Sequence, residues 1–383
     1  MTLIGSSLSQ LRLTNSKTIE KSTFVLAIDY SRASSELCVM TPGGIHVLDC
    51  YSLDTTAKLQ ADNDTKVEQF TDVKFVDENS VMCCSSDGYL RLWDTRQPTK
   101  VALTMASTTD TEATELKPLV SCDRIIDGTI ACAGSETVKD DAFILFWDIR
   151  DTRKLMGGYW ESHSKDVTQV RFHPTERGLL ATAGVDGLVN VFDIDEECED
   201  DALIHTLNAE CAVNHLSWLK PSSTGGHRFS LTTTEEELQL WEAESVEPVA
   251  RNSREQLAKQ IGGGESKEVK VDHLIGTVTF DDGASAVVSS SNEGGIELWS
   301  ESGSHMASLR GAHCDLSRVA VAGCMRSGRG YALWTAGEDG VVCCWTEGAY
   351  LHTAPGHTRA ATDDLKMESS IKSKARVHNI KPY

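Results

Sequence analysis

Residues 83–94 read CCSSDGYLRLWD, and variants of this phrase return along most of the chain. Each copy joins small polar residues to an acidic residue, glycine, alternating hydrophobic residues and a closing Trp-Asp or its equivalent. The other copies are FILFWD (143–148), ATAGVDGLVNVFD (181–193), SNEGGIELWS (291–300), AGEDGVVCCWT (336–346), GGIHVLD (43–49) and EEELQLWE (235–242). A unit of this length cannot bury its own hydrophobic faces, so we expect successive units to pack against one another.

The hydrophobic residue before each closing position sets the period of the repeat. These markers lie 45 to 58 residues apart, and they are Leu48, Trp93, Trp147, Phe192, Trp241, Trp299 and Trp345. That spacing is typical of WD40 blades with insertions in two places. Alternation with a period of two predicts strands, and each Asp-Gly pair predicts a tight turn in which glycine supplies a positive φ. We therefore predict an all-β fold, a seven-bladed WD40 β-propeller, over residues 1–357.

The two ends of the chain have different predicted roles. The last unit has three obvious strands of four, and residues 8–13 alternate weakly. We expect this N-terminal strand to complete the last blade and close the ring. Residues 251–268 predict a short helix followed by glycines. From residue 358 the β pattern stops, and the basic residues Lys372, Lys374, Arg376 and Lys381 predict a flexible basic C-terminal tail over 358–383.

Charge and cysteine content restrict the possible partners. The 383 residues include 57 acidic and 36 basic ones, for a formal net charge of −21. Such a surface repels phosphate backbones, so direct nucleic-acid binding is disfavoured and basic proteins are favoured. The 12 cysteines contain no CxxC pair and no zinc-site spacing. With no signal peptide or membrane-length apolar stretch, we predict an intracellular protein, cytoplasmic or nuclear or both, with reduced cysteines and no membrane contact.

Two units contain a buried hydrogen-bonding set that is familiar from WD40 repeats. The set comprises His313, Thr335, Asp339 and Trp345 in the last unit, and His163, Thr182 and Asp186 in the fourth. Phe192 replaces the tryptophan in the fourth unit and cannot donate a hydrogen bond. A His–Asp–hydroxyl triad is the catalytic alternative, but the same spacing recurs as an element of the fold. We predict a structural role and no enzymatic activity.

Two further segments invite ligand-binding interpretations. The glycines at 262–264 lack the GK[ST] sequence of a phosphate-binding loop. The run DEECEDD at 195–201 lacks the spaced ligands and central glycine of an EF-hand. No cofactor or metal is therefore predicted. The acidic run is expected to be a solvated loop or a contact for a basic partner.

Two consecutive units end in the pattern WDxR, at Trp93-Asp94-Thr95-Arg96 and Trp147-Asp148-Ile149-Arg150. This ending resembles the box by which WD40 substrate receptors dock on the propeller adaptor of cullin-4 ubiquitin ligases. The resemblance makes Arg96 and Arg150, with Asp94 and Asp148, candidate partner-binding residues, since arginine can form bidentate contacts. The alternative is that Asp-x-Arg only stabilises a local turn.

Longer runs resemble the WD repeat-containing protein 89 family. They are CAGSETVKDDAFILFWDIR (132–150), HSKDVTQVRFHP (163–174) and DGLVNVFDID (186–195), and the acidic run that follows also fits. The resemblance is weakest in the first, fifth and sixth units. It implies an intracellular propeller and no catalytic residues to carry over.

These observations predict a non-enzymatic protein-interaction scaffold, monomeric outside its complexes. The first hypothesis is a substrate receptor of a cullin-4 ubiquitin ligase. The second is an acidic scaffold or chaperone for basic nuclear proteins such as ribosomal proteins or histones.

Overall fold

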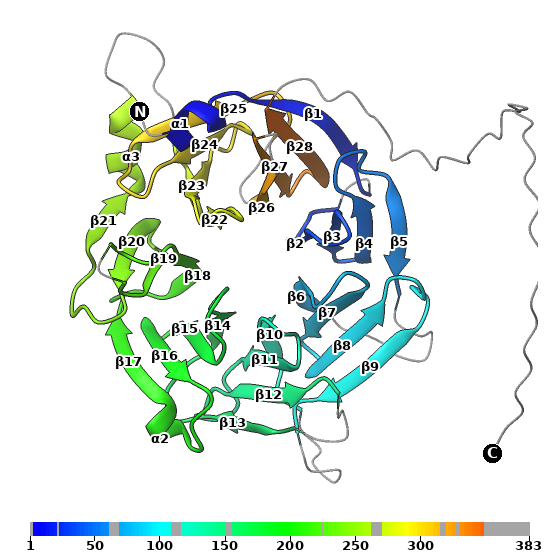
Figure 1. The fold of residues 1–383 in the computed structure, drawn as a ribbon, viewed down its shortest axis with the longest axis vertical. Helices are drawn as coiled ribbons and strands as arrows, with labels where there is room; N and C mark the ends of the chain where they lie inside the picture. Colours follow the sequence, from blue (N-terminus) through cyan, green and yellow to red (C-terminus); the bar gives the residue numbers. More distant parts are fainter. Residues whose placement is uncertain are drawn as a thin grey trace, which may run out of the picture. The chain divides into compact units, whose positions relative to one another are not determined.

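Seven four-stranded antiparallel sheets form a ring around a central axis (Figure 1). The computed structural model describes residues 3–20, 23–60, 69–108, 116–150, 155–223, 225–261, 270–314, 319–326 and 330–347. Residues Met1–Ala349 form one compact unit, and Tyr350–Tyr383 are assigned to a second. The predicted basic tail lies outside the described residues. The prediction of a seven-bladed WD40 propeller is confirmed.

Each blade runs from an inner strand at the axis to an outer strand at the perimeter. Blade 1 contains β2 (Ala27–Ser31), β3 (Glu36–Thr41), β4 (Gly44–Asp49) and β5 (Thr55–Leu59). Blade 2 contains β6 (Phe70–Phe75), β7 (Ser80–Ser85), β8 (Tyr89–Asp94) and β9 (Val101–Ala106). Blade 3 contains β10 (Leu119–Arg124), β11 (Ile130–Ser135), β12 (Ile144–Asp148) and β13 (Gly157–Tyr159). Blade 4 contains β14 (Val167–Phe172), β15 (Leu179–Gly184), β16 (Leu188–Asp193) and β17 (Leu203–Asn208).

The remaining three blades follow the same order. Blade 5 contains β18 (Val213–Leu219), β19 (Arg228–Thr233), β20 (Glu237–Glu242) and β21 (Ala250–Ser253). Blade 6 contains β22 (His273–Thr279), β23 (Ser285–Ser290), β24 (Ile296–Trp299) and β25 (His305–Leu309). Blade 7 contains β26 (Val319–Arg326), β27 (Gly330–Gly337), β28 (Val341–Glu347) and the N-terminal β1 (Leu11–Thr18). In the described part of the chain, helix α1 (Leu3–Leu8) precedes β1, and helices α2 (Glu199–Ala202) and α3 (Arg254–Ile261) lie between strands.

The ring closes through the antiparallel pair β1–β28, in which Leu11 faces Glu347 and Thr18 faces Val341. The N-terminal segment therefore completes blade 7, but the predicted range of 8–13 for this strand is wrong. Leu8 ends helix α1 and is buried in the cluster shared by blades 6 and 7. Leu8 thus contributes to the core as part of a helix. The weak alternation of residues 8–13 could not indicate this.

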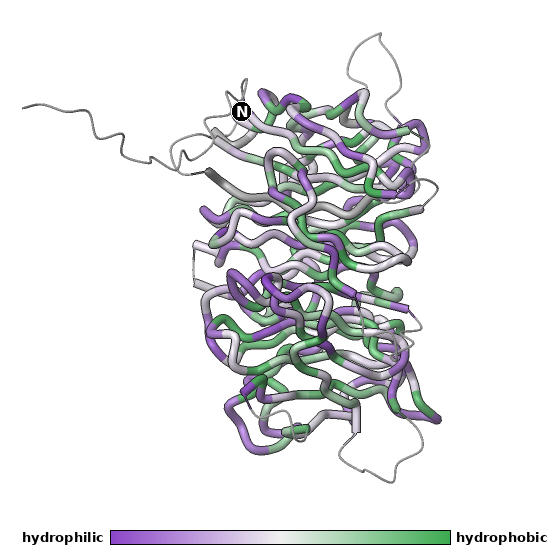
Figure 2. The backbone as a smooth tube through the Cα atoms, turned by 90° about the vertical axis from the view of Figure 1, so that its right-hand side faces the viewer, coloured by the Kyte–Doolittle hydropathy of each residue, from purple (hydrophilic) through white to green (hydrophobic). Residues whose placement is uncertain are grey.

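The core lies between neighbouring blades. The seven marker residues of the repeat are each at most 3% exposed. Most buried clusters combine residues of two successive blades; for example, Ala181 and Val189 of blade 4 pack with Leu216 and Trp218 of blade 5. In the edge-on view, hydrophobic backbone segments run through the interior and hydrophilic ones lie mainly at the turns (Figure 2). A blade with two apolar faces is stable only between two others, which explains why the units form a ring.

The Asp-Gly turns have the expected backbone geometry. Gly88, Gly187 and Gly340 have φ of 82°, 77° and 70°, a region that costs glycine little. Blade 5 has no glycine at this turn, and Glu236 takes φ of 59° there. Among the described residues, no helix has the length and apolar composition needed to cross a membrane.

Candidate interaction sites

The buried set in blade 7 forms a continuous chain of hydrogen bonds. Nδ1 of His313 lies 3.1 Å from Asp339 Oδ2, and Nε2 lies 2.8 Å from Thr335 Oγ1. The indole N–H of Trp345 donates to the same hydroxyl over 2.9 Å. Thr335 is fully buried, so its hydroxyl cannot reach a substrate. The arrangement links β27, β28, the turn between them and the loop before the blade, as a structural element would.

Blade 4 repeats this arrangement without tryptophan. His163 lies 3.1 Å from Asp186 and 2.8 Å from Thr182, and the Asn190 amide lies 3.3 Å from His163 Nε2. Burial raises the pKa of Asp186, but hydrogen bonds from His163 and from backbone N–H groups outweigh it and lower the pKa below its ordinary value. Asp339 in blade 7 has its pKa lowered by the same balance.

In blade 2 a buried arginine, which was not predicted as a site residue, bonds the turn aspartate in place of the histidine. The buried Arg91 on β8 forms an ion pair with Asp87 of the turn at 2.6 Å. Its guanidinium also donates to Ser85 Oγ over 2.6 Å. An arginine four residues after the turn aspartate, in place of a histidine before the blade, is the signal that could have identified it.

The two WDxR endings have nearly identical geometry. Arg96 donates to Asp94 from Nε over 2.8 Å and from Nη2 over 2.7 Å. Arg150 donates to Asp148 over 2.9 and 2.7 Å from the same atoms. The arginine side chains are 69% and 71% exposed. Because β8 and β12 occupy equivalent places in adjacent blades, the two Asp–Arg forks lie on the same face of the ring.

The turn beneath each fork also forms where no arginine is present. Asp94 accepts the backbone N–H of the residue two positions later at 2.9 Å. In blade 4, Asp193 accepts the N–H of Asp195 at 3.1 Å, and in blade 1, Asp49 accepts that of Tyr51 at 3.0 Å. The aspartate alone therefore closes this turn. The guanidinium of each fork is an addition that the turn does not require.

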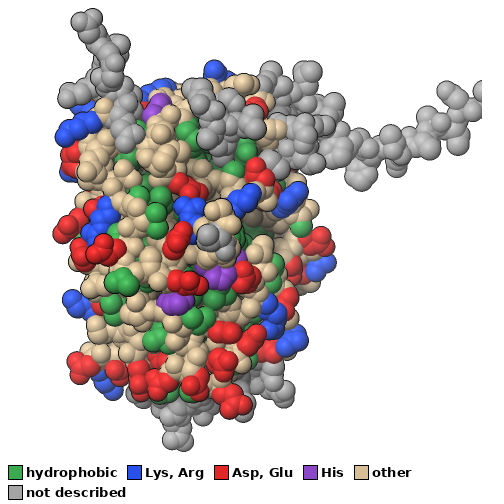
Figure 3. Space-filling model, turned by 60° about the vertical axis from the view of Figure 1, so that its left-hand side comes forward, with side chains coloured by type: hydrophobic (Ala, Val, Ile, Leu, Met, Phe, Trp, Pro, Cys, Tyr) green, Lys and Arg blue, Asp and Glu red, His purple; other side chains and the backbone are tan. Residues whose placement is uncertain are grey.

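The acidic run at 195–201 lies between β16 and β17, and helix α2 begins within it at Glu199. Asp195 pairs with Arg177 at 3.2 Å, and Asp201 accepts a hydrogen bond from the Cys198 thiol. In the ribbon view α2 lies on the perimeter of the ring near β13 (Figure 1). Acidic side chains are numerous toward the same end of the molecule in the space-filling view (Figure 3).

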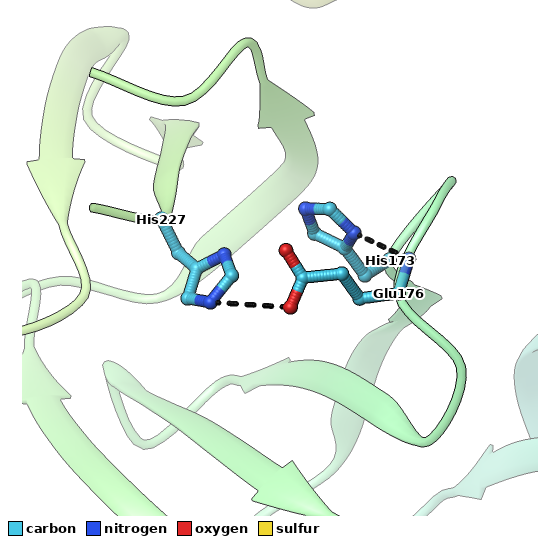
Figure 4. A group of neighbouring side chains, drawn as sticks. All are labelled: His173, Glu176 and His227. Carbon is cyan, nitrogen blue, oxygen red and sulfur yellow. Dashed lines mark hydrogen bonds and ion pairs between the residues drawn. The ribbon is translucent and has the colours of Figure 1, made fainter. Parts of the chain in front are cut away.

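Three side chains with metal-ligand chemistry converge between blades 4 and 5 (Figure 4). The ligand atoms of His173, Glu176 and His227 lie within 4.8 Å of one another. However, His173 Nδ1 accepts the backbone N–H of Glu176 at 3.0 Å, which places the proton of the neutral ring on Nε2. Burial lowers the pKa of His173, which favours this neutral ring. The ring nitrogen that faces the cluster thus carries a proton, so we assign His173 to capping the turn before β15.

Charged groups line the inner strands and join blades around the axis. Asp72 on β6 accepts the N–H of Cys122 at 3.2 Å and lies 3.4 Å from Arg171. Asp123 on β10 likewise accepts the N–H of Phe172 at 2.8 Å. Burial raises the pKa of Asp123 above its ordinary value. These carboxylates tie β6 to β10 and β10 to β14, which is a structural use of the charge.

Comparisons with known proteins support the repeat assignment. The family described as "WD domain, G-beta repeat" matches residues 41–94 and 156–193. WD repeat-containing protein GTS1 of Arabidopsis thaliana is 30% identical over 280 residues, which cover 68% of this chain and 65% of that protein. The WD repeat-containing protein 89 homolog of Dictyostelium discoideum is 28% identical over 176 residues, covering 46% and 44%.

A third relative is an uncharacterised WD repeat-containing protein of Schizosaccharomyces pombe, which is 31% identical over 141 residues, covering 36% of this chain and 40% of the relative. The chain thus spans less than two thirds of the length of each of these relatives. Seven four-stranded blades, the recurring buried tryptophans and these matches together identify the chain as a WD40-repeat β-propeller protein.

Proposed function

We propose that this protein is a protein-interaction scaffold that docks on the propeller adaptor of cullin-4 ubiquitin ligases through the forks of Arg96 and Arg150. The observation that carries this proposal is that the turns of blades 1 and 4 form with aspartate alone. The fold therefore does not require the two exposed guanidinium groups, which lie on adjacent blades. Arginine held flat by a carboxylate keeps donors directed outward and loses little side-chain entropy on binding.

Binding of the purified adaptor to the intact protein, measured by biolayer interferometry, tests this function. The Arg96→Ala/Arg150→Ala variant should bind roughly tenfold more weakly or worse, since interface arginines are frequent hot spots. Arg32→Ala is the matched control, because Arg32 is 65% exposed and pairs with Asp281. Unchanged adaptor binding by the double variant, or no binding by the wild type, would reject the proposal.

The second candidate function is an acidic scaffold or chaperone for basic nuclear proteins, such as ribosomal proteins or histones. It is favoured by Glu196, Glu197 and Asp200, exposed residues whose side chains have no hydrogen-bond or ion-pair partner among the described residues. Either function would be exercised in the cytoplasm or the nucleus. The test is binding of a basic protein to the variant Glu196→Gln/Glu197→Gln/Asp200→Asn. Binding as strong as that of the wild type would count against this candidate.

A further inference from the structure

A groove runs along the outer strand of blade 3. It has a volume of about 540 Å³ and is bounded by β13 with the residues on either side of it, by Ile130 and Phe146, and by residues 194 and 196–200 of blade 4. This volume lies in the range of sites that accept a large side chain or a small ligand. Strand β13 and helix α2, which contribute residues to the groove, lie at the perimeter of the ring (Figure 1).

The floor and one wall of the groove are apolar. Phe146 and Tyr159 are buried beneath it, and their rings contact each other at 5.0 Å between centroids. At the wall, Met156 is 57% exposed and Trp160 is 50% exposed. Two large, half-exposed apolar side chains that line one groove offer the kind of contact that anchors a partner's side chain.

The opposite wall is acidic, and its carboxylates fall into two groups. Glu199 is used by the fold, since it accepts the backbone N–H groups of Trp160, Glu161 and Ser162 at 2.8 to 3.0 Å. Glu196, Glu197 and Asp200 are exposed on the same wall and have no partner among the described residues. The first carboxylate thus fixes the acidic wall against the apolar one, and the other three remain available.

Charge complementarity selects the occupant of this groove. Three unpaired carboxylates within one site attract cations and repel phosphate or acidic segments, in a protein whose net charge is already −21. The apolar wall favours a hydrophobic side chain, which a simple cation does not offer. An occupant that satisfies both walls has a large hydrophobic side chain next to lysine or arginine residues.

We infer that the groove binds a short basic segment of a partner protein. One aromatic or long aliphatic side chain of the segment packs against Met156 and Trp160, and flanking lysine or arginine residues contact Glu196, Glu197 and Asp200. This inference rests on the second candidate function and names its contact site. It does not depend on Arg96 or Arg150, which line no part of the groove.

The test is selection of binders from a random twelve-residue phage-displayed peptide library on the intact protein. We expect enriched sequences with one large apolar residue flanked by lysine or arginine. The best synthetic peptide should bind roughly tenfold more weakly to Glu196→Gln/Glu197→Gln/Asp200→Asn and to Met156→Ser/Trp160→Ser. The matched control is Glu244→Gln, an exposed carboxylate of blade 5 outside the groove.

The remaining outcomes separate the inference from the function on which it rests. If only the charge variant loses binding, the carboxylates bind basic partners without the apolar wall, which overturns the inference of a two-walled site and leaves the second candidate function standing. If neither variant loses binding, or no basic consensus is enriched, both the inference and the second candidate function fail. A last variant tests competition by the chain's own tail and changes four of its residues to glutamine: Lys372, Lys374, Arg376 and Lys381. If peptides bind only to this variant, the tail is the occupant of the groove, and the assignment to a partner is overturned.

Discussion

His313 and Asp339 are joined across blade 7 at 3.1 Å, and both side chains are buried beneath the turn before β28. The contact fixes the loop before the blade to the turn between β27 and β28. Because the Asp339 carboxylate is stabilised by this contact, its folded-state pKa lies below its ordinary value. The pair therefore gives the stability of the fold a defined dependence on pH.

Asp339→Asn should lower the free energy of unfolding by about 1–3 kcal/mol at pH 7, the cost of losing a buried charge-assisted contact. A depressed pKa contributes stability that is complete above the unfolded pKa of about 3.9 and is lost as pH falls through the folded pKa. The difference between variant and wild type should thus shrink below about pH 4. Urea unfolding at a series of pH values measures it, with Glu244→Gln as control. A difference that stays constant down to pH 3 would contradict this account.

Leu8→Ala should destabilise the protein by about 2–5 kcal/mol, because a fully buried leucine leaves a cavity. Its side chain belongs to the cluster that joins blades 6 and 7, although it lies in α1 rather than in a strand. Leu13→Ala, on β1 and 39% exposed, should cost less than about 0.5 kcal/mol. Chemical unfolding compares the two, and equal effects would show that α1 does not pack as described.

Arg96→Ala should raise the pKa of Asp94 toward its ordinary value. The hydrogen bonds from the Arg96 side chain, followed by the one from its backbone N–H, hold this pKa at about 2. The backbone bond remains in the variant, so the turn and the thermal midpoint should be unchanged. Carboxyl-carbon NMR titration measures the pKa. If the pKa of Asp94 does not move, the guanidinium fork is not formed in solution.

The cysteines should separate by accessibility in the native protein. Eight of the eleven cysteines whose side chains are described are buried, while Cys198 and Cys314 are exposed. Burial also raises the pKa of the Cys38, Cys83, Cys122 and Cys132 thiols well above the ordinary value. Brief treatment with a thiol reagent, followed by peptide mass spectrometry, should find labelling at the exposed pair first.

The Cys198 thiol carries a further, local effect. Its hydrogen bond to Asp201 raises its pKa, which lowers the fraction of reactive thiolate. Asp201→Asn should therefore speed the labelling of Cys198 and leave Cys314 unaffected. Equal rates at Cys198 before and after the change would rule out this contact.

The fold was predictable because its signal is repeated. Seven marker residues at a regular spacing outweigh the weak copies, and even Leu48, which lacks an indole, takes the same buried place as Trp93. The N-terminal strand was predicted to begin too early, at residue 8, because α1 and the start of β1 both contain apolar residues and follow each other closely. Only packing against blades 6 and 7 decides where the helix ends.

The candidate sites were predictable only in part. The WDxR pattern located the forks, but the partner of each arginine depends on a turn whose geometry the sequence does not state. The acidic run appeared uniform, yet the structure divides it: Glu199 is held by three backbone N–H groups, whereas Glu196 is not. Trp160 lies 35 residues or more before that run and meets it only through the pairing of blades.

The pairing of β1 with β28 also sets an order of events during synthesis. The strand made first has to wait for the strand made last, so the ring cannot be sealed until about 330 residues of intervening chain have been translated. Until then blade 7 is incomplete, and the nascent chain exposes an unpaired strand edge and the apolar face that β1 and α1 will cover. A chain that ends before Glu347 therefore leaves an open ring with that seam exposed.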